Sequence, residues 1–292
     1  MRRPLRHDQG DGRGGGAFAR FVRDHVGLVP FLFFILFPIY FMVLTAFKSD
    51  RELYDLQAVP FWILDGIALG HFRHLLFKTN FWRWLLNSLV VSAVTMTVSV
   101  AISILAAYGL ARLRFPGRQG FGVGVFVTYL VPPTLLFLPL TQIVNWLGLI
   151  DSLWALILTY PTFLIPFCTW LLLGYFKVVP KEIEECALVD GCTRLGVLFR
   201  IVIPVAVPGI ICAMLFAFTL AWNEFLYALT FTSASVTKTV TVGVAGEMVR
   251  GDVFHWGGIM AGALVGALPV VVMYVLFLDY YVVGLTAGSV KG

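Results

Sequence analysis

The chain is a series of long apolar runs separated by short polar segments. Crossing about 30 Å of hydrocarbon takes about 20 helical residues, because the bilayer offers the backbone no other hydrogen-bond partners. Only Glu224 and Asp279 lie inside these runs as charged residues. The pattern predicts six transmembrane helices, at Val26–Phe47, Trp84–Ala111, Phe121–Asn145, Ser152–Leu173, Val205–Phe231 and Gly257–Val283.

Composition agrees with an all-α, polytopic membrane protein. Apolar residues make up 59% of the chain and charged residues 13%, against about 45–50% and about 25% in soluble domains. The basic residues are dispersed between the apolar runs, so the net charge of +5 does not indicate a partner made of nucleic acid. The four cysteines form no CxxC pair, which argues against a metal site or a disulfide framework.

The distribution of Lys and Arg predicts the orientation. Residues 1–25, 112–120, 174–204 and 284–292 carry 14 of them, and the alternate segments carry 7. By the positive-inside rule the first set is cytoplasmic, so both termini lie inside the cell. We predict a cytoplasmic basic tail at 1–25 and a transmembrane domain at 26–292. The first apolar run is too long for a signal peptide and lacks a small-x-small cleavage site, so we interpret it as a retained anchor.

Two spans carry small or hydroxylated residues on one helical face. Ser88, Ser92, Thr95, Ser99, Ser103 and Ala106 follow steps of three and four, and Gly258, Gly262 and Gly266 recur every four residues. Either tight helix packing or a polar pathway accounts for both stripes. In the third span Pro132, Pro133 and Pro139 predict a bent or broken helix.

Glu224 is the one acidic group well inside a predicted span, and it follows Trp222 and Asn223. An ionisable side chain at that depth is costly unless it faces a cavity or a partner. A ring beside amide and carboxylate groups has the chemistry to stack on a sugar and hydrogen-bond to it. A structural hydrogen bond to a neighbouring helix is the alternative.

The 174–204 loop is too polar for a span and too patterned for a linker. Pro180 and the acidic residues after it predict the start of a short helix, and Gly191 is placed to end it. A second short helix follows through Arg200 and is expected to stop at Pro204. The first helix carries apolar Ile183, Ala187 and Leu188 among acidic residues, which favours insertion into another protein. A plain amphipathic surface helix is the alternative.

Glu185-Cys186-Ala187, followed by Asp190-Gly191 and later by Ile203-Pro204, resembles the EAA loop of the membrane subunits of binding-protein-dependent ABC importers. Cys186 stands where the motif has its first Ala, a small-for-small exchange. Further segments resemble the shorter, six-span permease of the carbohydrate (maltose-type) family: Asn87-Ser88, Ala106-Ala107-Tyr108-Gly109-Leu110-Ala111-Arg112, Pro166-Phe167-Cys168-Thr169-Trp170, Trp222-Asn223-Glu224-Phe225, and Val283 to Gly292.

The resemblance implies a type I ABC importer permease fold in a prokaryotic inner membrane, surrounded by lipid. It implies four kinds of partner: a second homologous permease subunit, two cytoplasmic ATPase subunits, an extracytoplasmic solute-binding protein, and a carbohydrate substrate. The chain has no GxxxxGK[ST] loop, so ATP and Mg are expected on the ATPase subunits, and no cofactor or catalytic residue is expected here.

The resemblance also implies two sets of site residues. For coupling to the ATPase these are Glu184, Glu185, Cys186, Ala187, Asp190, Gly191 and Pro204. For the substrate pathway they are Asn87, Trp222, Asn223 and Glu224.

Other functions are also compatible with the six predicted spans. A polyol or glycerol-phosphate permease differs only in its solute. A secondary transporter needs buried ionisable relays, for which Glu224 alone is a poor supply. An intramembrane enzyme needs a catalytic constellation, and no HExxH or GxSxG signature occurs.

Overall fold

The apolar runs form helices in the computed structural model, which describes residues 26–250 and 253–287. Four helical segments are long and apolar enough to cross a membrane unbroken: α2 (Leu28–Phe47), α5 (Phe81–Arg112), the α8–α9 pair (Leu153–Thr159 and Pro161–Val178) and α16 (Trp256–Leu276). Two bent pairs bring the number to six within the described residues when each pair is counted as one span. The predicted count of six spans is confirmed, whereas the basic tail at 1–25 and the last five residues lie outside the described part.

The first bent pair is the predicted proline-rich span. Helices α6 (Arg118–Leu130) and α7 (Pro133–Trp146) meet at 93°, with Val131 and Pro132 between them. Pro133 stands in the first turn of α7, where its missing N–H costs nothing, and Pro139 is accommodated inside that helix. The broken helix is confirmed, and the break falls at Pro132.

The fifth and sixth spans differ from their predicted bounds. The fifth span is α13 (Val207–Trp222), preceded at 80° by residues 194–205, and it ends before Asn223. A separate helix, α14 (Leu226–Phe231), follows, so the predicted span Val205–Phe231 starts within two residues of the observed helix but wrongly merges α13 with α14. The sixth span is interrupted at Phe277 and continues as α17 (Leu278–Ala287), which packs against α13.

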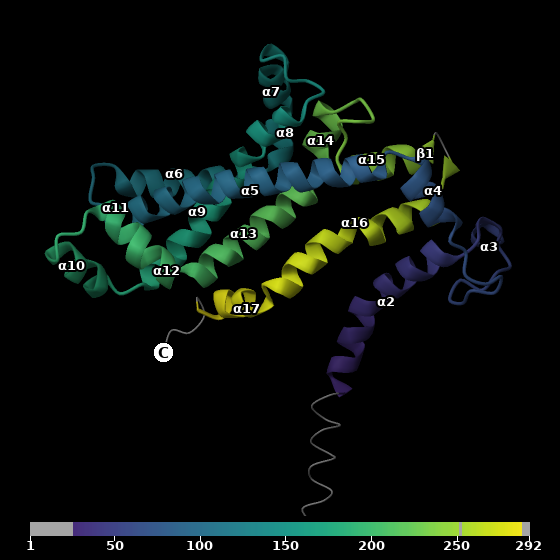
Figure 1. The fold of residues 1–292 in the computed structure, drawn as a ribbon, viewed down its shortest axis with the longest axis horizontal. Helices are drawn as coiled ribbons and strands as arrows, with labels where there is room; N and C mark the ends of the chain where they lie inside the picture. The colour runs from purple at the N-terminus through teal and green to yellow at the C-terminus, as the bar shows by residue number, and fades with distance from the viewer. Residues whose placement is uncertain (1–25, 251–252, 288–292) are drawn as a thin grey trace, which may run out of the picture.

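Helix α5 forms the centre of the bundle, where it packs against α9 and α13 (Figure 1). The hydroxyl-bearing stripe predicted on this helix faces protein rather than lipid, since Ser88, Ser92, Thr95, Ser99 and Ser103 are all buried. Some of these hydroxyls join helices directly: the Ser103 hydroxyl donates to the Ile165 carbonyl oxygen at 3.1 Å. The stripe is therefore a packing surface in this conformation.

The glycine stripe of α16 also serves close packing. Helix α15 (Val240–Met248) lies against α16, and a Cβ atom added to Gly262 would come within 2.6 Å of the Val244 side chain. A Cβ atom added to Gly258 would meet the Met248 sulfur at the same distance. The spacing therefore lets two helices approach where side chains would separate them.

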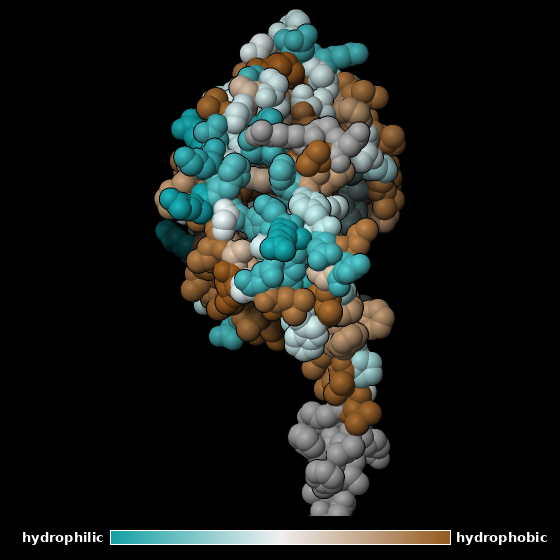
Figure 2. Space-filling view, turned by 90° about the vertical axis from the view of Figure 1, so that its right-hand side faces the viewer, coloured by the Kyte–Doolittle hydropathy of each residue, from teal (hydrophilic) through white to brown (hydrophobic). Residues whose placement is uncertain are grey.

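The two ends of the bundle carry different structures. At one end lie α3 (Asp50–Tyr54), α4 (Gly70–Lys78) and an antiparallel hairpin of β1 (Val249–Arg250) and β2 (Val253–Phe254), a small departure from an all-α chain. The opposite end carries α10 (Lys181–Val189), α11 (Arg194–Val197), the π-helical turn η1 (Leu198–Val202) and α12 (Ile203–Val205) (Figure 1). Hydrophilic side chains gather on the α3–α4 end, and hydrophobic ones lie along the flanks (Figure 2).

Candidate functional site

Helix α10 has the ends that its sequence predicts. Pro180 stands at the N-cap, and Gly191 follows the helix with φ of +87°, a left-handed conformation that favours glycine. The Cys192 N–H donates to the Ala187 carbonyl oxygen at 3.0 Å, and the Gly191 N–H to that of Leu188 at 3.1 Å. This pair of bonds is a Schellman motif, which satisfies the last carbonyl groups of the helix.

A buried ion pair attaches α10 to the end of α5. Arg112 donates from Nε to the Glu184 carboxylate at 2.5 Å, and both side chains are almost fully buried, with 4% and 3% of their surface exposed. A second guanidinium nitrogen donates to the Val179 carbonyl oxygen at 2.6 Å. The Tyr108 hydroxyl lies 3.5 Å from the same carboxylate. Glu184 therefore faces its own chain rather than a partner.

The opposite face of α10 is open. Glu185, Cys186 and Asp190 are exposed, and so are apolar Ile183 and Val189 at 46% and 88%. Within this chain Ala187 is buried and Leu188 packs against the hydrophobic core, so Ile183 is the exposed member of the three apolar residues expected to insert into another protein. The α10 face available to a partner is thus formed by Ile183, Glu185, Cys186, Val189 and Asp190.

The second short helix of the 174–204 loop was expected to stop at Pro204, and this expectation is wrong. The helical path continues to Val205, and the 80° bend comes at Ala206. The five-residue π-helical turn η1 directly precedes α12. Since the regular i to i−4 hydrogen-bond ladder is already interrupted in a π turn, the missing N–H of Pro204 is tolerated there.

Glu224 lies in the break between α13 and α14, and its carboxylate is occupied. It accepts hydrogen bonds from the Tyr160 hydroxyl at 2.9 Å and from the N–H groups of Tyr227 and Ala228 at 2.9 and 3.1 Å. The two N–H groups belong to the first turn of α14 and have no partner within that helix. This geometry corresponds to the structural alternative for Glu224, in which the carboxylate joins Tyr160, between α8 and α9, to the start of α14.

Trp222 and Asn223 line a cavity of about 410 Å³ between α13, α15 and α16. The Trp222 indole stacks on Phe218 and donates to the Gly266 carbonyl oxygen at 3.2 Å. The Asn223 side chain is exposed, and its amide nitrogen donates to the Thr219 carbonyl oxygen at 3.0 Å. Thr241 contributes a hydroxyl to the same lining, which is otherwise mainly apolar. The structure thus brings Trp222 and Asn223 together at one cavity and directs Glu224 away from it.

Asn87 is a buried residue of α5 that holds a loop. Its amide nitrogen donates to the carbonyl oxygens of Val236 and Lys238 at 2.8 and 2.9 Å. The same loop is held from the other side by Asp151, whose carboxylate accepts hydrogen bonds from the N–H groups of Ser233 and Ala234 and from the Thr237 hydroxyl. These bonds lower the pKa of Asp151 below its usual range, and the bond from the Thr237 hydroxyl has the largest effect.

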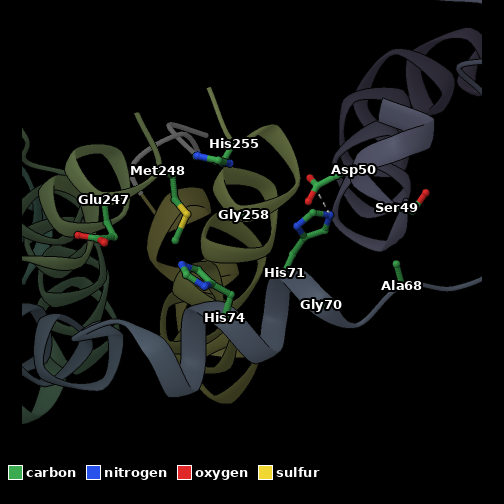
Figure 3. Close-up of a pocket in the computed structure, with 10 residues that line it drawn as sticks. All are labelled: Ser49, Asp50, Ala68, Gly70, His71, His74, Glu247, Met248, His255 and Gly258. Atoms are coloured by element: carbon green, nitrogen blue, oxygen red, sulfur yellow. Dashed lines mark ion pairs between the residues drawn. The ribbon is translucent and has the colours of Figure 1, made fainter. Parts of the chain in front are cut away.

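The α3–α4 end contains a cavity of about 530 Å³ (Figure 3). His71 points toward Asp50 with a ring nitrogen 3.8 Å from its carboxylate and 2.9 Å from the Lys48 carbonyl oxygen, whereas His74 and His255 lie apart from it. No group of three His, Cys, Asp or Glu side chains in the described part of the chain is arranged to hold a metal ion. The cavity is a polar recess in the end face.

Next to this recess, Lys48 and Glu52 form a buried ion pair at 3.0 Å. Glu52 also accepts hydrogen bonds from the N–H groups of Leu64 and Asp65. Burial alone raises the pKa of Glu52, but the bonds from Lys48 and from the two N–H groups outweigh burial and leave the pKa below its ordinary value. Glu52 thereby fixes the loop between α3 and α4.

Sequence reasoning missed Arg112 and Tyr108 as site residues, although both lie in a segment that carries the family resemblance. The available signal was an arginine at the end of a span on the same predicted side as the acidic α10. The pairing joins residues 72 positions apart, which no local pattern reveals.

Comparisons with known proteins agree with the fold. Residues 99–282 match the family model described as "Binding-protein-dependent transport system inner membrane component". The inner membrane ABC transporter permease protein YcjP of Escherichia coli is 40% identical over 92% of this chain and 95% of its own. The trehalose/maltose transport system permease protein MalG of Thermococcus litoralis is 32% identical over 91% and 95%. A crystal structure of a bacterial ABC transporter for the import of the acidic polysaccharide alginate shares the fold, with a TM-score of 0.73, 20% identity and coverage of 94% of this chain and 100% of that one.

The chain belongs to the family of binding-protein-dependent transport system inner membrane components. It is a multi-pass permease subunit of an ABC importer and not an enzyme. The resemblance drawn from the EAA loop is confirmed by this membership.

Proposed function

We propose that this permease subunit moves a sugar into the cytoplasm by alternating access, driven by separate ATPase subunits that hold ATP and Mg. The observation that carries the proposal is the mainly apolar cavity beside the break of α13, where Trp222, Asn223 and Thr241 converge. Its volume of about 410 Å³ falls in the range of small-molecule sites, about 300–1,000 Å³. The relative named as a trehalose/maltose permease supports a carbohydrate as the solute class.

Coupling to the ATPase uses the exposed face of α10. Ile183 and Val189 supply apolar contact area, and Glu185 and Asp190 supply charge at the edge. The ion pair of Glu184 with Arg112 and the bonds to Val179 and Tyr108 hold α10 to the membrane helices. A push on α10 therefore reaches α5, and ATP binding drives transport because it favours one arrangement of the helices over the other.

A second, homologous permease subunit completes the pathway. In this chain α2 leaves the bundle (Figure 1), and nearly all its apolar residues are exposed. Such a surface needs lipid or another membrane subunit as its neighbour. The hydrophilic end face around α3 and α4 receives the solute-binding protein outside the cell (Figure 2).

Uptake by the reconstituted importer tests the function. The complex is placed in vesicles with its binding protein, and labelled disaccharide, monosaccharide, polyol and glycerol phosphate are compared. We expect sugar uptake that requires ATP and the ATPase subunits and that survives ionophores. Uptake of glycerol phosphate or a polyol alone would establish the alternative solute class. Uptake abolished by ionophores and independent of ATP would establish a secondary transporter.

Paired variants test the assignment of the pathway. Asn223→Ala should change solute preference or transport rate per complex, because it removes an exposed polar group from the cavity. Glu224→Gln should instead lower the free energy of unfolding by about 1–3 kcal/mol, because an amide nitrogen would face donors that now meet a carboxylate oxygen. The amount of assembled complex and its melting temperature should fall accordingly. If Asn223→Ala leaves uptake per complex unchanged for every sugar, this cavity is not part of the pathway.

Cys186 offers a natural probe of orientation. It is exposed, whereas Cys168 and Cys212 are buried and Cys192 is partly so. We expect a membrane-impermeant thiol reagent to label Cys186 in inverted vesicles and not in intact cells, with Cys186→Ser as the control. Labelling from outside intact cells would reverse the proposed cytoplasmic position of α10 and of both termini.

A further inference from the structure

A cavity of about 600 Å³ lies between the end of α5, the start of α6 and the start of α10. Its lining is unusual for a mainly apolar chain, because it combines basic side chains from four helices and the α5–α6 turn. These are Arg112, Arg114, Arg118, Lys181 and Arg194.

Most of this positive charge is not neutralised within the protein. Glu184 pairs with Arg112, which leaves Glu185 as the other acidic lining residue. Across residues 26–250 and 253–287, no ion pair within 4.0 Å involves Arg114, Arg118, Lys181 or Arg194. Four positive charges therefore share a recess with one carboxylate. The electrostatic potential in the recess is positive and attracts an anion.

The cavity also lies beside an apolar surface. Helix α6 has no buried residue, and Phe121 and Val123 in its first two turns are 67% and 61% exposed. Leu113 and Phe115 belong to the cavity lining itself, and each is 38% exposed. This arrangement, at the end of two membrane-spanning helices, is complementary to an anionic lipid. The basic recess matches the negatively charged headgroup, and the apolar side chains beside it match the acyl chains.

We infer that this cavity binds the phosphate group of an anionic lipid from the cytoplasmic leaflet. The guanidinium groups of Arg114 and Arg118 donate to the phosphate oxygens, and the acyl chains lie along α6. An acidic segment of a protein partner would satisfy the charges but not the exposed apolar surface of α6. The inference rests on the proposed cytoplasmic position of this end of the bundle.

Lipid binding to the purified, delipidated importer complex tests the inference by native mass spectrometry. Phosphatidylglycerol and phosphatidylcholine with the same acyl chains are titrated separately. We expect preference for phosphatidylglycerol and a roughly 30-fold weaker affinity for it in Arg114→Gln/Arg118→Gln, from about 1 kcal/mol for each basic group. Arg73→Gln/Arg83→Gln removes two exposed arginines from the opposite end and should change the affinity less than about twofold.

Four results would overturn the inference. One is equal binding of the two lipids, and another is equal affinity of the two double variants for phosphatidylglycerol. A third is binding of inorganic phosphate alone as tightly as the lipid, which would identify a soluble anion. Loss of the ATPase subunits from Arg114→Gln/Arg118→Gln, with lipid binding intact, would identify a protein contact instead. Solute uptake enters none of these measurements, so failure of the sugar assignment leaves them interpretable.

Discussion

Replacing one member of the Arg112–Glu184 ion pair should detach α10 from α5. The two side chains are only 4% and 3% exposed, so the remaining charge would be buried without its partner. Loss of one partner costs about 3–5 kcal/mol for a buried pair, against less than about 1 kcal/mol for a pair on the surface. The buried class applies here, so we expect Arg112→Met and Glu184→Leu each to increase the opening of α10 by more than about 100-fold.

The double variant Arg112→Met/Glu184→Leu separates the charge effect from simple loss of packing. Two apolar side chains of similar volume often replace a buried ion pair without loss of stability. We therefore expect the double variant to recover most of the stability that either single variant loses. Arg112→Lys should fall between, because an ammonium group cannot reproduce the fork that reaches both Glu184 and the Val179 carbonyl oxygen.

Amide hydrogen exchange across residues 181–189 and the melting temperature of the purified complex measure these effects, with transport per ATP hydrolysed as the functional readout. Arg83→Met is the matched control, since Arg83 lies exposed at the other end of α5. Exchange within about twofold of the parent in both single variants, or a double variant whose loss equals the sum of the singles, would refute the proposed attachment.

Three further effects follow from backbone geometry and from lowered carboxyl pKa values. Gly191→Ala should destabilise the α10 turn by about 1 kcal/mol, because φ is +87° there although no atom crowds the position. Gly174→Ala, inside α9 with free space around it, should not destabilise its helix, and amide hydrogen exchange around each position measures the difference. Asp151→Ala should lower the melting temperature by the equivalent of about 1–3 kcal/mol, since the N–H groups of the 232–239 loop lose their acceptor. Glu52 should make the α3–α4 loop sensitive to acid. Because the pKa of Glu52 is lower in the folded protein, its stabilising contribution is complete above the unfolded pKa of about 4.3 and is lost as pH falls through the lower folded pKa. Proteolysis of the α3–α4 loop should therefore increase over this acidic range in the parent protein. In Glu52→Gln the rate of proteolysis should not depend on pH in this range.

The sequence supported prediction of the spans because the bilayer imposes a length that apolar runs must meet. It also supported prediction of α10, because Pro180 and Gly191 act through local backbone rules that hold wherever the helix lies. The EAA loop was recognisable for the same reason, since its residues are contiguous. These features depend on neighbours within a few positions along the chain.

The breaks in the spans were less predictable, because prolines in a membrane helix have more than one outcome. Pro132 lies at a 93° bend, whereas Pro139, Pro166 and Pro269 lie within helices. Whether the helix continues depends on which groups from other helices satisfy the freed carbonyl oxygens and fill the space. That information belongs to the packed bundle and not to the tripeptide around each proline.

Glu224 shows how the same limit affects a functional assignment. The sequence established the cost of an isolated carboxylate at membrane depth, and that cost implied either a ligand or a structural partner. The partners are the Tyr160 hydroxyl, 64 residues away, and the first N–H groups of α14, a helix that the apolar pattern had merged with α13. Because the break both creates those free N–H groups and positions the carboxylate to accept from them, Glu224 stabilises the break itself. The polar group that the same break leaves at the cavity is Asn223, so of the two polar residues predicted to contact substrate there, the neutral amide and not the carboxylate lines the cavity.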